Sequence, residues 1–85
     1  MIMSLPTPEQ VRQYIADGLS CTHIEVSGDG SHFDAVIVSE AFAGKRLIAR
    51  HQLVYAALGT RMHAEIHALS MSTLTPQEYA SRQAN

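Results

Sequence analysis

The sequence contains a single cysteine, Cys21, among 85 residues, which excludes an internal disulfide and suits a reducing compartment. Tryptophan is absent and aromatic residues make up only 6%, so little surface is available for stacking on nucleic-acid bases. No apolar run approaches the ~18 residues of a membrane span. The segment from Met1 to Gln10 lacks the basic and apolar regions of a secretory signal. These absences predict a cytoplasmic protein with no membrane segment.

Acidic residues are missing from one long segment of the chain. Between Glu40 and Glu65 there is no aspartate or glutamate. Four of the six lysines and arginines lie in that segment, namely Lys45, Arg46, Arg50 and Arg61. The net charge of the whole chain is −2, which argues against attraction of the whole molecule to nucleic acid. A contact with phosphates or with an acidic partner would therefore use this segment.

The remaining composition indicates one small globular domain. Hydrophobic residues make up 46% and charged residues 16%, a balance typical of folded proteins. A chain of 85 residues buries enough surface for one modest core. No repeat or linker interrupts it, so we expect a single domain over 1–85 with an ordered core from about residue 7 to about residue 80.

The first half of the chain predicts a helix followed by a hairpin. Thr7 and Gln10 form a capping box around Pro8, which suits the first helical position. Alternating polar and apolar residues predict strands over His23–Ser27 and His32–Val38. The glycine-rich turn between them favours antiparallel pairing of the two strands.

The central helix is expected from about Lys45 to Leu58, after a turn that ends at Gly44. At ~100° per residue, six side chains fall within about a third of its circumference and predict a core-facing stripe: Leu47, Ile48, His51, Val54, Tyr55 and Leu58. We expect His51 to be a core histidine that donates a hydrogen bond to a backbone carbonyl. Such a bond would hold the helix against the sheet.

Arg46, Arg50 and Leu53 share another flank of this helix, on its predicted solvent side. Leu53 would have nothing to pack on within its own domain, and protein interfaces favour arginine with a few apolar anchors. The flank is therefore a candidate partner surface. The alternative is a solvated face with one isolated leucine, which is ordinary for a folded protein.

The last third of the chain predicts a short helical turn over Thr60–Ala64, a strand over Glu65–Thr73, and a helix to about Arg82 that Thr75 and Glu78 cap. The element order is therefore α-β-β-α-α-β-α. A three-stranded sheet with helices on one face would bury the apolar stripes together, which is an α+β fold.

No catalytic constellation stands out, so we do not expect an enzyme. Cys21 has no obvious base near it in the sequence, and the segment His63–His67 lacks the H-E-x-x-H order of a zinc protease. His67 opens the last strand near the end of the sheet, where an imidazole can serve as an iron–sulfur ligand. The alternative is a histidine at the boundary of the core. His32 closes the hairpin turn and is expected at the surface.

Several separate motifs resemble the BolA family. They are Phe42-x-Gly44, RHQLVY at 50–55, IHAL at 66–69 and LTPxEY at 74–79. The hairpin loop SGDGSHF at 27–33 is similar to that of the IbaG branch in particular. The motifs occur in the family's order, and the resemblance covers nearly the whole chain.

The resemblance implies a type II KH-like fold and a non-enzymatic partner of a monothiol glutaredoxin. In such pairs the two proteins share a [2Fe-2S] cluster, with thiolates from the glutaredoxin and its bound glutathione and a histidine that corresponds to His67. Some members supply a second ligand from the hairpin loop, where this sequence offers His32. The implied role is iron–sulfur cluster delivery, iron sensing or stress response. By itself the chain is expected to be a monomer or a weak homodimer.

The family is also discussed as transcription regulators, because its fold is KH-like. KH domains clamp the nucleic-acid backbone with a G-x-x-G loop, and this sequence has no such motif. The alternative function is therefore DNA binding through the basic segment, with Lys45, Arg46, Arg50 and Arg61 as the contacting residues.

Overall fold

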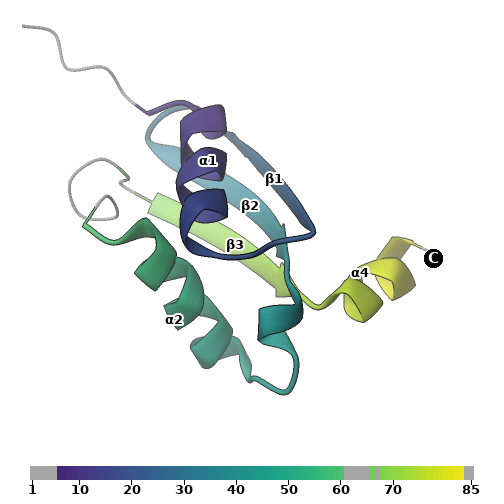
Figure 1. Ribbon diagram of the computed structural model, residues 1–85. Coiled ribbons are helices and arrows are strands. Elements are labelled where there is room, and N and C mark those ends of the chain that lie inside the picture. Colours follow the sequence, from purple (N-terminus) through teal and green to yellow (C-terminus); the bar gives the residue numbers. More distant parts are fainter. Residues whose placement is uncertain (1–5, 61–65, 67, 84–85) are drawn as a thin grey trace, which may run out of the picture.

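The structure is a computed structural model that describes residues 6–60, 66 and 68–83. It confirms an α+β fold (Figure 1). Its elements are α1 (Pro8–Gly18), β1 (His23–Gly28), β2 (His32–Val38), the 3₁₀ turn η1 (Glu40–Phe42), α2 (Leu47–Leu58), β3 (Ala68–Leu74) and α4 (Pro76–Gln83). The short helical turn that the sequence predicts after Thr60 lies outside the described residues.

The three strands form one sheet in the order β1-β2-β3. β1 and β2 pair antiparallel, with Ile24 opposite Ile37, which confirms the predicted hairpin. β2 and β3 pair parallel, with Phe33 opposite Leu69. Parallel neighbours need a crossover connection, and α2 lies in that connection. The sheet is therefore mixed, a feature that the strand pattern alone does not predict.

α1 and α2 cover one face of the sheet and enclose the core (Figure 1). The capping box of Thr7 and Gln10 is present at the start of α1. The two helices approach closely where Gly18 meets Ala57, because a Cβ at Gly18 would lie 2.7 Å from the Ala57 Cα atom. The buried hydrophobic core contains Val11, Ile15, Phe33, Ala35, Ile37, Phe42, Val54, Leu58 and Ile66.

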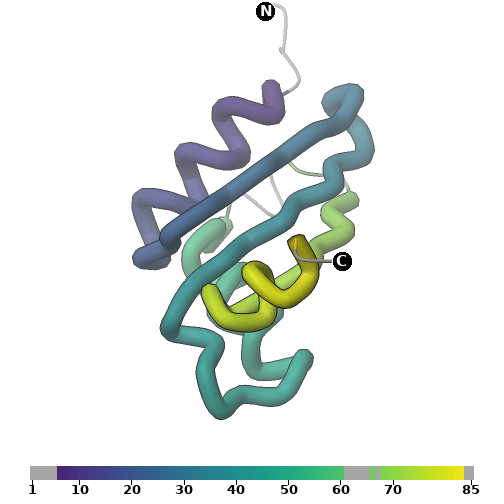
Figure 2. The backbone as a smooth tube through the Cα atoms, turned by 90° about the vertical axis from the view of Figure 1, so that its right-hand side faces the viewer, coloured from purple at the N-terminus to yellow at the C-terminus, as the bar shows by residue number. Residues whose placement is uncertain are grey.

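α4 departs from the expectation that the helices share one face. Ile24 and Val26 face the core, so the alternation of β1 directs His23 and Glu25 to the opposite face. The Tyr79 ring of α4 stacks on His23, with 5.0 Å between ring centroids, and its hydroxyl donates to Glu25. α1 and α4 consequently lie on opposite sides of the strands (Figure 2). No side chain of α4 is fully buried, so partly exposed contacts such as those of Tyr79 hold the helix in place.

Candidate functional site

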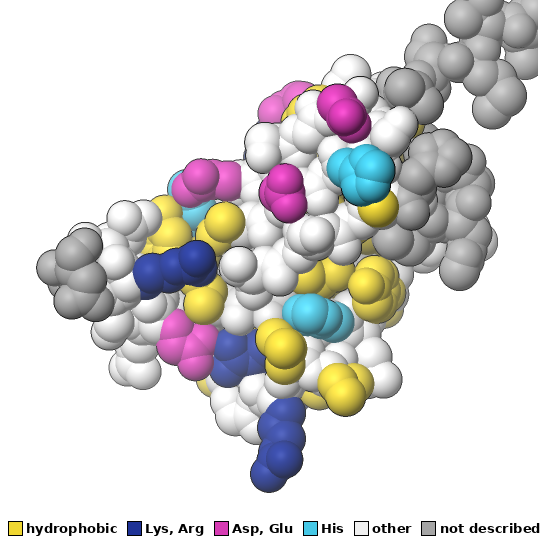
Figure 3. All heavy atoms as spheres, turned by 180° about the vertical axis from the view of Figure 1, so that it is seen from behind, with side chains coloured by type: hydrophobic (Ala, Val, Ile, Leu, Met, Phe, Trp, Pro, Cys, Tyr) yellow, Lys and Arg dark blue, Asp and Glu magenta, His cyan; other side chains and the backbone are white. Residues whose placement is uncertain are grey.

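α2 presents a different face to the core than its sequence pattern predicts. Val54 and Leu58 are fully buried, as expected. Three other members of the predicted stripe are exposed: Leu47 to 61%, Ile48 to 74% and Tyr55 to 41%. The prediction of a core-facing position is therefore wrong for these three residues. Seen from behind, hydrophobic side chains gather on the surface of the domain (Figure 3).

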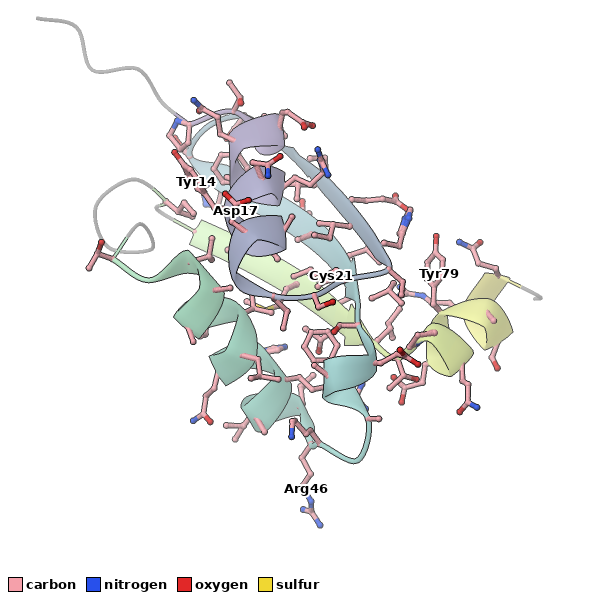
Figure 4. All side chains as sticks on the ribbon, viewed as in Figure 1. Tyr14, Asp17, Cys21, Arg46 and Tyr79 are labelled. Carbon is pink, nitrogen blue, oxygen red and sulfur yellow. The ribbon has the colours of Figure 1, made fainter. Side chains whose placement is uncertain are left out.

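The flank that the sequence places on the solvent side of α2 is also partly turned toward the core. Leu53 is partly buried and packs against the core, so it has a place within its own domain. The side chain of Arg50 is only 13% exposed. The prediction of a solvent-side position is therefore wrong for Leu53 and Arg50. Arg46 is the member of the flank that is exposed, and its side chain points away from the domain (Figure 4).

Arg50 ties three elements of the fold together. Its Nη1 donates to the Thr73 carbonyl at 2.9 Å and to Glu78 Oε1 at 2.7 Å. Its Nη2 donates to the other Glu78 oxygen, and its Nε donates to the Lys45 carbonyl at 2.8 Å. The guanidinium carbon also lies 6.0 Å from the centre of the Phe42 ring. These contacts join the start of α2 to the end of β3 and to α4.

Glu78 is held as a carboxylate by this arrangement. Its Oε1 also accepts from the Thr75 backbone nitrogen, while Thr75 Oγ1 accepts from the Glu78 nitrogen, which confirms the predicted capping box of α4. The Glu78 pKa is lowered to about 2. The largest cause is the hydrogen bond from Arg50, and the next is the hydrogen bond from the Thr75 backbone nitrogen. The same pairing raises the pKa of Arg50.

Two contacts explain why α2 is rotated away from the expected orientation. Arg50 finds a carboxylate and a carbonyl on the inner side of the helix, which compensates the charge it brings there. Ala57 meets Gly18 of α1, where only a small pair of residues fits. Directing Arg50 and Ala57 inward leaves Ile48 and Tyr55 on the outer side, because they lie across the helix axis.

His51 lies at the border between the two sides of α2. It is half-buried, and its Nε2 is buried without a hydrogen-bond partner in the part of the chain that the structure describes. This nitrogen therefore does not make the expected bond to a backbone carbonyl. A position between the core and the exposed side chains describes His51 better than a core position.

The basic segment leaves two exposed cations at the start of α2. Lys45 and Arg46 are exposed, and neither forms an ion pair with another described residue. Arg50 is bound to Glu78, and Arg61 lies outside the described residues. Of the four predicted nucleic-acid contacts, the structure thus places Lys45 and Arg46 together at the surface.

The hairpin positions the first candidate ligand, His32. Asp29 Oδ1 accepts from the backbone nitrogens of Ser31 and His32, each at 2.9 Å, which fixes the turn and lowers the pKa of Asp29. The His32 side chain is exposed, and its Cα is paired in register with Ala68 of β3. His67 lies outside the described residues. The strand register places His32 beside Ala68, and Ala68 directly follows His67 in the sequence.

The remaining candidate chemistry is limited. The Cys21 thiol is half-buried and donates to the Leu19 carbonyl at 3.4 Å, and burial raises its pKa, which disfavours a reactive thiolate. Among residues 6–60, 66 and 68–83, no three His, Cys, Asp or Glu side chains lie close enough to hold a metal ion. The helices in the same ranges are all too short or too polar to cross a membrane.

Known proteins with similar sequences fall into one group. The family described as BolA-like protein matches residues 15–78. The chain is 46% identical over 78 residues to Protein BOLA2 of Arabidopsis thaliana, covering 86% of this chain and 83% of that one. It is 36% identical to the acid stress protein IbaG of Escherichia coli over 84% of this chain and 86% of that one. It is also 36% identical to the DNA-binding transcriptional regulator BolA of Escherichia coli, over 75% of this chain and 61% of that one.

A solved structure shares the architecture. The BolA protein homologue from Coxiella burnetii superposes with a TM-score of 0.75 at 42% identity, over 94% of this chain and 99% of that one. The sequence motifs, the mixed sheet and these similarities agree. The chain therefore belongs to the BolA family.

Proposed function

We propose that this protein shares a [2Fe-2S] cluster with a monothiol glutaredoxin, with His67 as its principal ligand and His32 as the second candidate. The position of His32 is the observation that supports this most directly. Its exposed imidazole lies at the end of the sheet where β3 begins, one residue after His67. A neutral imidazole is a competent ligand for an iron–sulfur cluster.

The partner is part of the proposal because a [2Fe-2S] cluster takes four ligands, and the proposal assigns only two histidines to this chain. Two histidines leave coordination positions that thiolates of the glutaredoxin and its glutathione would fill. Ligation needs neutral imidazole, so cluster binding should weaken in acid. Delivery of clusters, iron sensing or a response to stress would follow from this sharing. A cytoplasmic setting, where the free Cys21 stays reduced, belongs to the same proposal.

Anaerobic reconstitution tests the cluster site. The protein is mixed with a monothiol glutaredoxin, glutathione, iron and sulfide, and visible absorption and circular dichroism are compared with those of the glutaredoxin alone. We expect a changed spectrum that His67→Ala abolishes and His32→Ala weakens. The matched control is His23→Ala, at the other end of the hairpin, which should leave the spectrum of the mixed complex intact. A mixture whose spectrum equals that of the glutaredoxin alone contradicts the proposal.

DNA binding is the second candidate function. One relative is named a DNA-binding transcriptional regulator, and Lys45 and Arg46 are exposed without an acidic partner in the described ranges. Binding measured across a salt series should lose affinity steeply, with a slope of about 0.9 for each phosphate contact. Arg46→Gln should reduce that slope, whereas Arg82→Gln on α4 should not. Absence of binding at low salt removes this candidate.

A further inference from the structure

The turn between β1 and β2 is built around one residue, Asp29. Its Oδ1 accepts hydrogen bonds from the backbone nitrogens of Ser31 and His32, each at 2.9 Å. Its own backbone nitrogen donates to the His32 carbonyl at 3.2 Å. The backbone nitrogen and the backbone carbonyl of His32 are therefore both bound to Asp29. A carboxylate forms stronger hydrogen bonds than a neutral acceptor, so this restraint is a firm one.

Two glycines give this turn its shape. Gly30 has a φ of 100°, a region that residues with a Cβ rarely adopt. A Cβ at Gly28 would collide with the His32 carbonyl oxygen, so a larger residue does not fit there. The local sequence is thus committed to one backbone geometry around His32.

The turn is also tied to the start of β3. The Ala68 nitrogen donates to the Ser31 carbonyl at 3.1 Å, and His32 pairs with Ala68 in the strand register. The backbone of His32 is held by Asp29 and lies against the neighbouring strand. Its side chain is exposed and forms no hydrogen bond with another residue in the described part of the chain. A fixed backbone that carries an available imidazole suits a metal ligand, because the ring nitrogen keeps its lone pair for the metal.

We propose that Asp29 is a positioning residue for His32, and that its carboxylate fixes the turn so that the imidazole meets the shared cluster in one geometry. The inference rests on the proposed function, because it gives a role to the residue that supports one of the two candidate ligands. Asp29 does not touch the cluster and acts only through the backbone of His32. A turn that is ordered before the partner arrives loses less conformational entropy on binding.

Three substitutions of Asp29 separate positioning from charge. Asp29→Asn removes the charge and keeps an oxygen that accepts the same two hydrogen bonds. Asp29→Ser keeps a weaker acceptor, and Asp29→Ala keeps none. Positioning therefore predicts effects that increase from asparagine through serine to alanine. Asp34→Ala is the matched control, because Asp34 is an exposed carboxylate two residues beyond His32 that forms no ion pair with another described residue.

The first measurement needs neither cluster nor partner. Amide hydrogen exchange of the full chain is followed by nuclear magnetic resonance. The Ser31 and His32 amides should exchange about 10-fold faster in Asp29→Ala than in the parent, because each amide has lost its acceptor. Asp29→Asn and Asp34→Ala should exchange like the parent. Unchanged exchange in Asp29→Ala overturns the inference.

The second measurement uses the reconstituted complex with the monothiol glutaredoxin. Asp29→Ala should shift the visible circular dichroism toward that of His32→Ala and hold the cluster about 10-fold more weakly against a chelator, as loss of a residue that orients a ligand does. Asp29→Asn should keep the parent's spectrum. Asp29→Ser carries both measurements in the event that Asp29→Ala does not fold, with smaller changes in the same direction.

The outcomes distinguish the two proposals. A spectrum that depends on His32 but not on Asp29 overturns the role of Asp29 and leaves the proposed function standing. An Asp29→Asn complex that behaves like Asp29→Ala also overturns positioning, since charge alone would then matter. A parent mixture with the spectrum of the glutaredoxin alone overturns the proposed function, and the role of Asp29 falls with it.

Discussion

The side of α2 that faces the sheet, its inner face, holds a charged residue that is usually exposed. The opposite side, its outer face, holds apolar residues that are usually buried. The inner face includes an arginine, Arg50, with a side chain only 13% exposed. The outer face includes an isoleucine, Ile48, that is 74% exposed. Available partners decide this difference. Arg50 meets Glu78 and the Thr73 carbonyl inside the fold, whereas Ile48 lies on the exposed side of the helix.

The comparison shows that hydrophobic surplus in a small domain can carry functional information. A domain of this size has one core, and residues beyond those it needs remain at the surface. When they gather on one helix, they form a candidate contact surface. Four predictions test the difference between the two faces, beginning with the largest expected effect.

Leu58→Ala and Leu47→Ala apply one chemical change to the two faces. Leu58 is fully buried, so its truncation should lower the free energy of unfolding by about 2–5 kcal/mol. Leu47 is 61% exposed, and its truncation should change that free energy by no more than about 0.5 kcal/mol. Urea unfolding of dilute protein measures both. Equal losses would mean that the two faces do not differ in burial.

Gly18→Ala tests the close contact beneath the inner face. In an exposed helix this change stabilises, since alanine is the better helix former. Here the new Cβ would lie 2.7 Å from the Ala57 Cα, so we expect a loss of about 1–3 kcal/mol in the free energy of unfolding. Asp17→Ala, at the adjacent exposed position, is the control and should be near neutral. A more stable Gly18→Ala protein would show that the helices have room to separate.

Arg50→Gln and Arg46→Gln compare an inner with an outer arginine. Loss of Arg50 removes its hydrogen bond to the Thr73 carbonyl and both of its bonds to Glu78, so the melting temperature should fall clearly. The exposed Arg46 side chain forms no ion pair with another described residue, and its replacement should leave the melting temperature nearly unchanged. Thermal unfolding followed by circular dichroism measures both variants. Equal melting temperatures would place Arg50 outside the network that holds α4.

Glu78→Gln tests the partner of Arg50 through the pH dependence of stability. The folded pKa of Glu78 is about 2, below the usual value of 4.5, so the folded state favours the carboxylate. The stabilisation from Glu78 is therefore present above about pH 4.5 and is lost as pH falls toward 2. The parent should melt higher than Glu78→Gln at pH 6, and this difference should shrink toward pH 2. A difference that does not depend on pH would contradict the ion pair.

Local patterns predicted most of the secondary structure. Both capping boxes are present, and β2 covers the predicted residues His32–Val38. α2 begins at Leu47, two residues after the predicted start, because Arg46 occupies the cap position. In the candidate site, the exposed position of His32 was predicted from its place at the end of the hairpin turn. The role of His67 remains a prediction from the family resemblance. The outer face of α2 had a signal in the sequence, since its helix has too few polar residues for a half-exposed element.

The sequence by itself determined the elements, the hairpin and the caps, because each depends on hydrogen bonds and side-chain alternation within a few residues. It did not determine the rotation of α2, the parallel pairing of β2 with β3, or the side of the sheet that α4 takes. Those features depend on contacts between distant residues, such as Arg50 with Glu78, Gly18 with Ala57 and Tyr79 with His23. Only the tertiary structure decides them, because the free energy of each contact exists only after the chain has brought its two residues together.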